Sequence, residues 1–170
     1  MVVYLVRHGL AVERGSEGIP SDAARPLTEE GIARMKVQAR GLAALPREAD
    51  RPGVILTSPL LRALQTAEII QKALPERIEV VETRALGPAT QPKTLIRLLA
   101  GRTDAGVVLV GHEPFMGQLM SLMLVGHTRM AVDFRKGGCA CIRFEGEVAA
   151  GKGALEWHLP PKALRSLGKR

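Results

Sequence analysis

The chain has 170 residues and a mass of 18.3 kDa, which suits one domain with a buried core, and we expect a single domain over residues 1–170. Its residues are 46% hydrophobic but only 3% aromatic, which predicts an aliphatic core and argues against stacking platforms for single-stranded nucleic acid. The formal net charge of +7 favours an anionic partner, but no basic helix or zinc pattern of a nucleic-acid-binding module is present.

The first part of the chain predicts a buried strand that ends in a long polar loop. Residues 1–6 are apolar and rich in β-formers, and this pattern stops abruptly at Arg7. Residues 10–26 are rich in glycine, proline, serine and charge, which predicts an irregular loop, and loops of this length are more often functional than decorative. Thr28 then caps a predicted helix that ends at Pro46.

The rest of the chain alternates between predicted strands and helices. The helix after the second strand is expected to begin at Pro59, with Ser58 and Thr66 capping and packing it. This alternation predicts an α/β fold, a three-layer α/β/α sandwich around a mostly parallel sheet, with the last two strands at one end of the sheet. The predicted segments are strand 54–57, helix 59–74, strand 79–81, helix 92–99, strand 106–110, helix 111–124, strand 140–144 and strand 155–159.

The two cysteines match neither a disulfide framework nor a zinc site. Cys139 and Cys141 are one residue apart, which places them on the same face if the segment is a strand. No apolar run is long enough to span a membrane, and no signal-peptide pattern or cofactor-binding fingerprint is present. We therefore expect a cytoplasmic protein that needs no metal and no cofactor and binds neither membrane nor nucleic acid.

Basic and imidazole side chains follow three of the predicted strands. Arg7 and His8 follow the first strand, Arg62 comes shortly after the second, and His112 follows the strand at 106–110. Because the carboxyl ends of parallel strands meet at one edge of a sheet, we expect these side chains to converge there. Arginine offers a planar fork of donors to phosphate oxygens. The pattern therefore predicts a site for a phosphoryl dianion.

Four ordered segments carry these residues and the predicted element ends. They are Leu5-Val6-Arg7-His8-Gly9, Arg25-Pro26-Leu27-Thr28 with Gly31, Ser58-Pro59-Leu60-Leu61-Arg62-Ala63-Leu64-Gln65-Thr66, and Val110-Gly111-His112-Glu113-Pro114. The chain thereby resembles the histidine phosphatase superfamily (phosphoglycerate mutase-like), and within it the small phosphohistidine phosphatases of the SixA type. The Arg-His-Gly triplet alone would be weak evidence, whereas four blocks in order are specific.

The resemblance implies a role for each of these side chains. His8, kept neutral, would attack phosphorus and form a transient phosphohistidine, with a backbone carbonyl on Nδ1 leaving Nε2 as the nucleophile. Arg7, Arg62 and a protonated His112 would neutralise the phosphoryl oxygens. Arg25 matches a family position near the phosphate pocket, but it is equally suited to fixing the loop before the Thr28 cap.

The segment in which relatives carry a general acid has no carboxylate here, because residues 84–89 read Arg-Ala-Leu-Gly-Pro-Ala. Glu82 lies nearby as a weak candidate, and no pattern singles out one of the other carboxylates, which are Glu13, Glu17, Asp22 and Glu113. A phosphohistidine leaves as an imidazole and tolerates the missing acid. The predicted partner is therefore a histidine-phosphorylated carrier domain of a signalling protein.

Two other functions remain open. A phosphomonoesterase that acts on a small phosphorylated substrate would draw its acid from a loop, and a non-catalytic phospho-binding module would need the arginines but not His8. Leu10 stands where relatives often have an acidic or polar residue, a departure that bears on water positioning or substrate choice. His127 and His158 have no such neighbours in sequence and are predicted to be ordinary surface or packing residues.

Overall fold

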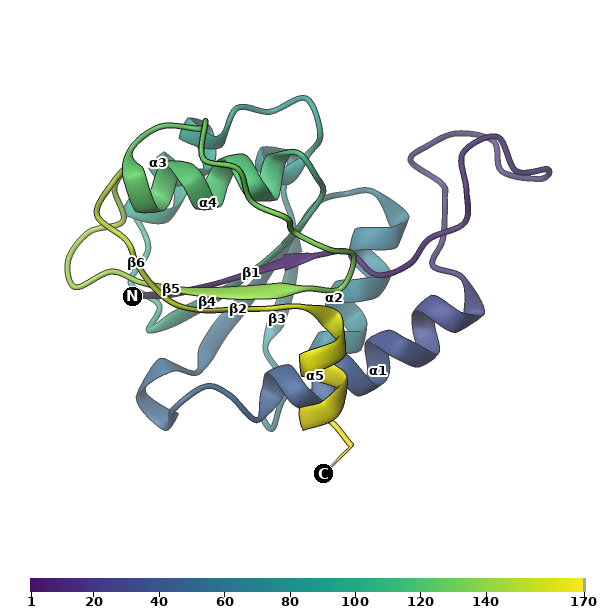
Figure 1. Ribbon diagram of the computed structural model, residues 1–170, viewed down its shortest axis with the longest axis horizontal. Coiled ribbons are helices and arrows are strands. Elements are labelled where there is room, and N and C mark those ends of the chain that lie inside the picture. The colour runs from purple at the N-terminus through teal and green to yellow at the C-terminus, as the bar shows by residue number, and fades with distance from the viewer. Residues whose placement is uncertain (170) are drawn as a thin grey trace.

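The computed structural model describes residues 1–169, which form one six-stranded sheet and the helices around it (Figure 1). The strands are β1 (Val2–Arg7), β2 (Pro52–Thr57), β3 (Glu79–Glu82), β4 (Gly106–Gly111), β5 (Cys139–Arg143) and β6 (Ala154–Leu159). The helices are α1 (Glu29–Ala43), α2 (Leu61–Ala73), α3 (Pro92–Ala100), α4 (Phe115–Val125) and α5 (Pro161–Leu167), with short 3₁₀ turns at Glu48–Asp50 and Arg84–Leu86.

The strand order is β3-β2-β4-β1-β5-β6. The first four strands of this order run parallel, and β5 and β6 are antiparallel to their neighbours at one end. Helices α3 and α4 cover one face of the sheet, and α1, α2 and α5 cover the other (Figure 1). The predicted three-layer α/β/α sandwich with a mostly parallel sheet is confirmed.

The two faces of the sheet bury alternate residues of the same strand, as a strand with a helix layer on each side requires. In β1, Val3 and Leu5 pack with α3 and α4, whereas Tyr4 and Val6 pack with α1 and α2. Cys139 and Cys141 are buried free thiols. Both lie on the face of the sheet that packs against α1 and α2, and this shared face is what their spacing predicted. Within residues 1–169, no helix is long and apolar enough to cross a membrane.

The carboxyl edge of the sheet brings three loops together. β1 pairs with β4 so that Arg7 lies opposite Gly111, and β2 pairs with β4 so that Thr57 lies opposite Val110. Two backbone hydrogen bonds extend this pairing past the ends of the strands. The His8 N–H donates to the Gly111 carbonyl and the Ser58 N–H donates to the Val110 carbonyl, each at 3.0 Å. The residues that follow these strands therefore lie side by side: His8, Ser58 and His112.

Two predicted helix starts were wrong, and one of them is that of α4, which begins at Phe115 rather than at Gly111, the last residue of β4. Helix α2 begins at Leu61 rather than Pro59, and its cap residue, Leu60, forms no side-chain capping bond. Ser58 is fully buried; its hydroxyl accepts from the Leu60 N–H at 3.4 Å, just before α2, and lies 2.8 Å from Nε2 of His112. The short helix α5 was missed; it packs on α1, where a Cβ at Gly41 would collide with the Leu164 carbonyl.

Thr28 and Gly31 hold the long loop against the start of α1. The Thr28 hydroxyl accepts from the Gly31 N–H at 2.9 Å, which confirms the predicted cap. The Thr28 N–H donates to the Leu10 carbonyl at 3.0 Å, and a Cβ at Gly31 would collide with that same oxygen. The absence of a side chain at Gly31 thus lets the residues after His8 lie directly on the helix.

We predict that Gly31→Ala lowers the free energy of unfolding by about 1–3 kcal/mol, because the new methyl group forces the Leu10 backbone away from α1. Urea denaturation measures the change. Gly101→Ala is the matched control, since a Cβ there meets nothing within 4 Å and the residue has an ordinary φ of −85°. Equal losses in the two variants would contradict this account of Gly31.

Candidate active site

His8 lies just past the end of β1 and is 6% exposed. Its Nδ1 is 2.7 Å from the Gly9 carbonyl, and since a carbonyl only accepts, Nδ1 carries the proton and Nε2 keeps its lone pair. Burial, followed by the positive charges of Arg62 and Arg7, lowers the pKa of His8 to about 3, so the ring is neutral at pH 7. The Gly9 N–H donates to the Thr66 hydroxyl at 3.1 Å, which ties this turn to α2.

His112 lies beside His8, with the two ring centroids 5.1 Å apart and the planes tilted by 54°. Its Nε2 is 2.8 Å from the Ser58 hydroxyl, and its buried Nδ1 has no hydrogen-bond partner among the described residues. Burial, followed by the positive charge of Arg62, lowers the pKa of His112 to about 4. Burial among cations thus keeps the ring neutral near pH 7 in the free protein, and the imidazolium expected with a bound phosphoryl group stays a prediction.

The guanidinium groups of Arg62 and Arg7 are both held by backbone carbonyls. Arg62 is only 5% exposed; its Nη1 donates to the Asp22 carbonyl at 2.7 Å and its Nη2 to the Asp22 carboxylate at 3.1 Å. Arg7 donates from Nη1 to the Phe134 carbonyl at 2.7 Å, and its buried Nε has no partner among residues 1–169. A guanidinium has five N–H donors, so each group keeps donors for a ligand.

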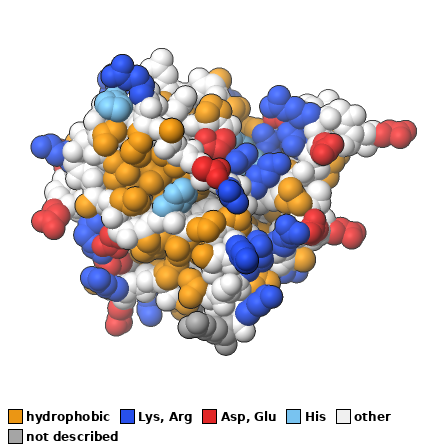
Figure 2. All heavy atoms as spheres, in the orientation of Figure 1, with side chains coloured by type: hydrophobic (Ala, Val, Ile, Leu, Met, Phe, Trp, Pro, Cys, Tyr) orange, Lys and Arg blue, Asp and Glu red, His pale blue; other side chains and the backbone are white. Residues whose placement is uncertain are grey.

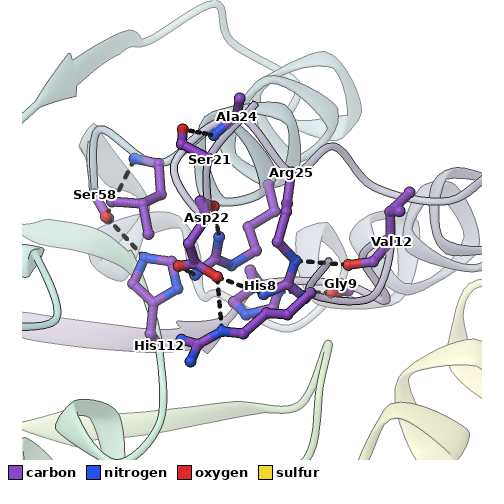
Figure 3. A network of polar contacts seen from close by, with 12 residues as sticks. His8, Gly9, Val12, Ser21, Asp22, Ala24, Arg25, Ser58 and His112 are labelled. Carbon is purple, nitrogen blue, oxygen red and sulfur yellow. Dashed lines mark hydrogen bonds and ion pairs between the residues drawn. The ribbon is translucent and has the colours of Figure 1, made fainter. Parts of the chain in front are cut away.

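Asp22 is the anion at the centre of this cluster (Figure 3). Its Oδ1 accepts from Arg25 at 2.7 Å and from Arg14 at 2.8 Å, and its Oδ2 accepts from Arg62. The hydrogen bond from Arg25, and then that from Arg62, hold the pKa of Asp22 far below its usual range. Figure 2 shows Lys and Arg side chains gathered at the base of the projecting loop 10–26, from which Asp22 comes.

The other predicted phosphate ligand and proton donors either lie far from the two histidines or already form hydrogen bonds with other groups. Arg25 also donates from Nε to the Val12 carbonyl at 2.7 Å, so it fixes the loop, and its contact with phosphate stays a prediction. Glu82 is exposed on β3, which β2 and β4 separate from β1. Glu113 accepts from the Gly117 N–H at 3.1 Å, and burial raises the pKa of its carboxyl group.

The other residues singled out from the sequence have ordinary surroundings. Glu13 and Glu17 are exposed on the long loop, and His127 is exposed after α4. His158 packs its ring on Phe134, with centroids 4.9 Å apart. Within residues 1–169, no three His, Cys, Asp or Glu side chains are grouped so that they could hold a metal ion.

Sequence reasoning missed the contacts that hold the site together. Ser58 contacts His112 only because β2 and β4 turn out to be neighbours, which strand order alone reveals. Thr66 anchors Gly9 across a separation of 57 residues, and nothing local indicates it. The one available signal was the spacing of Asp22 and Arg25, three residues apart in a loop already suspected of function.

Comparisons with known proteins agree with this geometry. Residues 3–87 match the model of the histidine phosphatase superfamily, branch 1. An uncharacterised protein of Picosynechococcus is 35% identical over 147 residues, which cover 84% of this chain and 85% of that protein.

Two solved structures are similar over almost their whole length. The structure of the protein histidine phosphatase SixA complexed with tungstate has a TM-score of 0.80 and 27% identity, covering 96% of this chain and 99% of that one. The putative phosphohistidine phosphatase SixA from Agrobacterium tumefaciens has a TM-score of 0.75 and 28% identity, covering 94% and 97%.

The neutral histidines predict a loss of stability in mild acid. Unfolding restores the ordinary pKa of 6.5, so below that pH the unfolded chain binds protons that the folded protein does not. Above pH 6.5 these rings are neutral in both states and do not affect the free energy of unfolding. As the pH falls from 6.5 toward 4, the free energy of unfolding decreases by up to about 1.4 kcal/mol per pH unit for each histidine.

Urea denaturation between pH 7 and about 4.5 measures this slope, in a range above the ordinary carboxyl pKa values. His8→Asn is expected to make the dependence on pH clearly shallower, whereas His127→Asn, which changes an exposed histidine, leaves it as in the wild type. A slope unaffected by His8→Asn would show that His8 is not buried as a neutral ring.

Proposed function

The chain belongs to the histidine phosphatase superfamily, and from that premise we propose that this phosphatase dephosphorylates phosphohistidine in a signalling protein through an intermediate on His8. The observation that carries the proposal is the pairing of a neutral His8, whose Nε2 lone pair is free, with two buried or half-buried arginines at the same edge of the sheet. A neutral imidazole is a competent nucleophile, and the arginines supply the positive charge that a phosphoryl group requires.

In the first step, the Nε2 lone pair of His8 forms a bond to phosphorus while the bond to the leaving group breaks and its electron pair stays on that group. Arg7 and Arg62 donate to the phosphoryl oxygens. The bound dianion also raises the pKa of His112, because an opposite charge beside the ring favours its protonated form. The imidazolium that the family resemblance implies is thus a property of the complex with substrate.

In the second step, water attacks phosphorus and the P–Nε2 bond breaks, with its electron pair returning to Nε2 of His8. Both protons of the water stay on the phosphate, which leaves as H2PO4⁻ and loses a proton to the solvent. The Gly9 carbonyl keeps the proton on Nδ1 throughout, so the ring is ready for another cycle. Since the guanidinium groups supply the positive charge, the proposed reaction is independent of metal ions.

A phosphohistidine substrate is supported by the absence of a carboxylate in residues 84–89 and by the exposed, distant position of Glu82. An alkoxide leaving group needs a proton donor, whereas an imidazole that already carries a proton on its other nitrogen does not. The two SixA structures, one described as a protein histidine phosphatase, support the same choice. We extend the proposal to a histidine-phosphorylated carrier domain in the cytoplasm as the partner.

A second candidate function is a phosphomonoesterase for a small substrate, and one observation favours it. Burial raises the pKa of Glu113, which follows His112 directly, so its carboxyl group holds a proton more readily than the other acids near the site. The carboxyl group already accepts the Gly117 N–H of α4, which favours a structural role.

We predict that the wild type, with a chelator present, releases phosphate from a histidine-phosphorylated carrier domain far faster than from a panel of small phosphomonoesters. His8→Ala reduces turnover to background, and Arg62→Ala or His112→Ala lowers it by about 10²–10³, as the removal of other transition-state donors does. His127→Ala is the matched control with wild-type activity, because His127 is exposed after α4.

Each other outcome points to a different function. Preference for one monoester, with a further loss in Glu113→Gln, would move the assignment to the phosphomonoesterase. Binding of the phosphorylated carrier without release of phosphate would identify a phospho-binding module. Activity in His8→Ala equal to the wild type would contradict the proposed nucleophile.

A further inference from the structure

The carboxylate of Asp22 has one acceptor position that the described part of the chain, residues 1–169, leaves unused. A carboxylate offers about four lone-pair positions, two on each oxygen. Among residues 1–169, Oδ1 accepts from Arg25 and Arg14, and Oδ2 accepts only from Arg62. The unused position is therefore on Oδ2, the oxygen that contacts the buried phosphate-binding arginine.

Asp22 is more exposed than the arginine and the histidine it lies beside, which suits a residue that meets the leaving group. Its side chain is 35% exposed, compared with 6% for that of Arg62. His8 is the buried nucleophile, and in an in-line transfer the leaving group is on the side of phosphorus opposite to it. Asp22 is also close enough to His112 for its negative charge to raise the pKa of that ring.

An imidazole leaving group and an alkoxide differ in the interactions that they can make with the free Oδ2 position of Asp22. The electron pair of the breaking P–N bond stays on the phosphorylated ring nitrogen, and the ring leaves as neutral imidazole if its other nitrogen already carries a proton. That N–H is a hydrogen-bond donor, and before transfer the protonated ring bears a positive charge. A monoester oxygen brings neither a donor nor a positive charge.

We propose that Asp22 is a specificity-determining residue, whose Oδ2 accepts the N–H of the imidazole leaving group and thereby selects phosphohistidine over phosphomonoesters. This inference rests on the proposed phosphohistidine phosphatase function. The hydrogen bond stabilises the protonated ring, which is the form that departs without a general acid. The reaction then needs no proton from the protein: the P–N bond breaks, its electrons stay on the substrate ring, and His8 gains the phosphoryl group.

The charge of Asp22 excludes a different role. Three guanidinium groups keep the carboxylate ionised, so it holds no proton to give to an alkoxide. A fixed negative charge beside the phosphate-binding arginine Arg62 also repels free phosphate dianion. Asp22 thus disfavours both the competing substrates and the product.

The test compares Asp22→Asn with the wild type on free Nε2-phosphohistidine and on p-nitrophenyl phosphate. The amide keeps the shape and one acceptor oxygen but removes the charge. We expect kcat/KM for phosphohistidine to fall about 10- to 100-fold, the effect of one charge-assisted hydrogen bond. For p-nitrophenyl phosphate we expect kcat/KM to fall by a clearly smaller factor, which reflects only the weaker hold on Arg62, and inorganic phosphate inhibits more strongly because a nearby anion is gone.

Glu17→Gln is the matched control, since it removes one negative charge from the same loop at an exposed position. It is expected to behave as the wild type with both substrates. Thermal denaturation of each variant checks folding, and Asp22→Ala, which lacks any acceptor, is expected to shift the substrate preference at least as far as Asp22→Asn.

Equal losses on both substrates, with weaker inhibition by phosphate, would overturn the inference and leave Asp22 as a residue that only positions Arg62 and Arg25. A wild type that cleaves p-nitrophenyl phosphate but not phosphohistidine would instead contradict the proposed function itself, and the inference with it. A preference for phosphohistidine that Asp22→Asn leaves unchanged would contradict the inference alone.

Discussion

Burying positive charge beside two neutral histidines is the constraint on which the rest of the site depends. Arg62 is almost fully enclosed, and a buried guanidinium without an anion or hydrogen-bond acceptors would be costly. Asp22 meets this need with its carbonyl and its carboxylate together. The loop that carries Asp22 is thereby held to α2 through Arg62, and the cationic side chains stay together at the edge of the sheet.

The strand order brings the two histidines to the same edge of the sheet as Arg62. Because β4 lies between β1 and β2, the turns that begin at His8, Ser58 and His112 are neighbours although they are about fifty residues apart in sequence. Backbone carbonyls then set the chemistry of single atoms: Gly9 fixes the proton of His8 on Nδ1, and Phe134 orients Arg7. Main-chain acceptors of this kind do not titrate, so the orientation holds over a wide pH range.

Much of the fold followed from the sequence, because apolar strands bounded by polar turns are a strong local signal. The four parallel strands, the Thr28 cap and the convergence of His8 with His112 all depend on such patterns. The protonation of His112 could not be predicted in the same way, since burial depends on the whole assembly.

Contacts between distant loops were also beyond the reach of sequence patterns. The bond from Ser58 to His112 depends on strand order, and the bond from Arg7 to Phe134 joins residues 127 positions apart. Helix α5, with seven residues, is too short for a clear periodicity and is stabilised by its contact with α1. In each case tertiary packing decided what local preference left open.

The central claim is that the phosphoryl group passes through Nε2 of His8. The most direct measurement is to mix the protein with a histidine-phosphorylated carrier labelled in its phosphoryl group, quench within one turnover in base, and locate the label by mass spectrometry. The account predicts phosphate on His8, formed and lost at rates consistent with turnover. Label on any other residue, or turnover with no phosphorylated protein at any time, would contradict it.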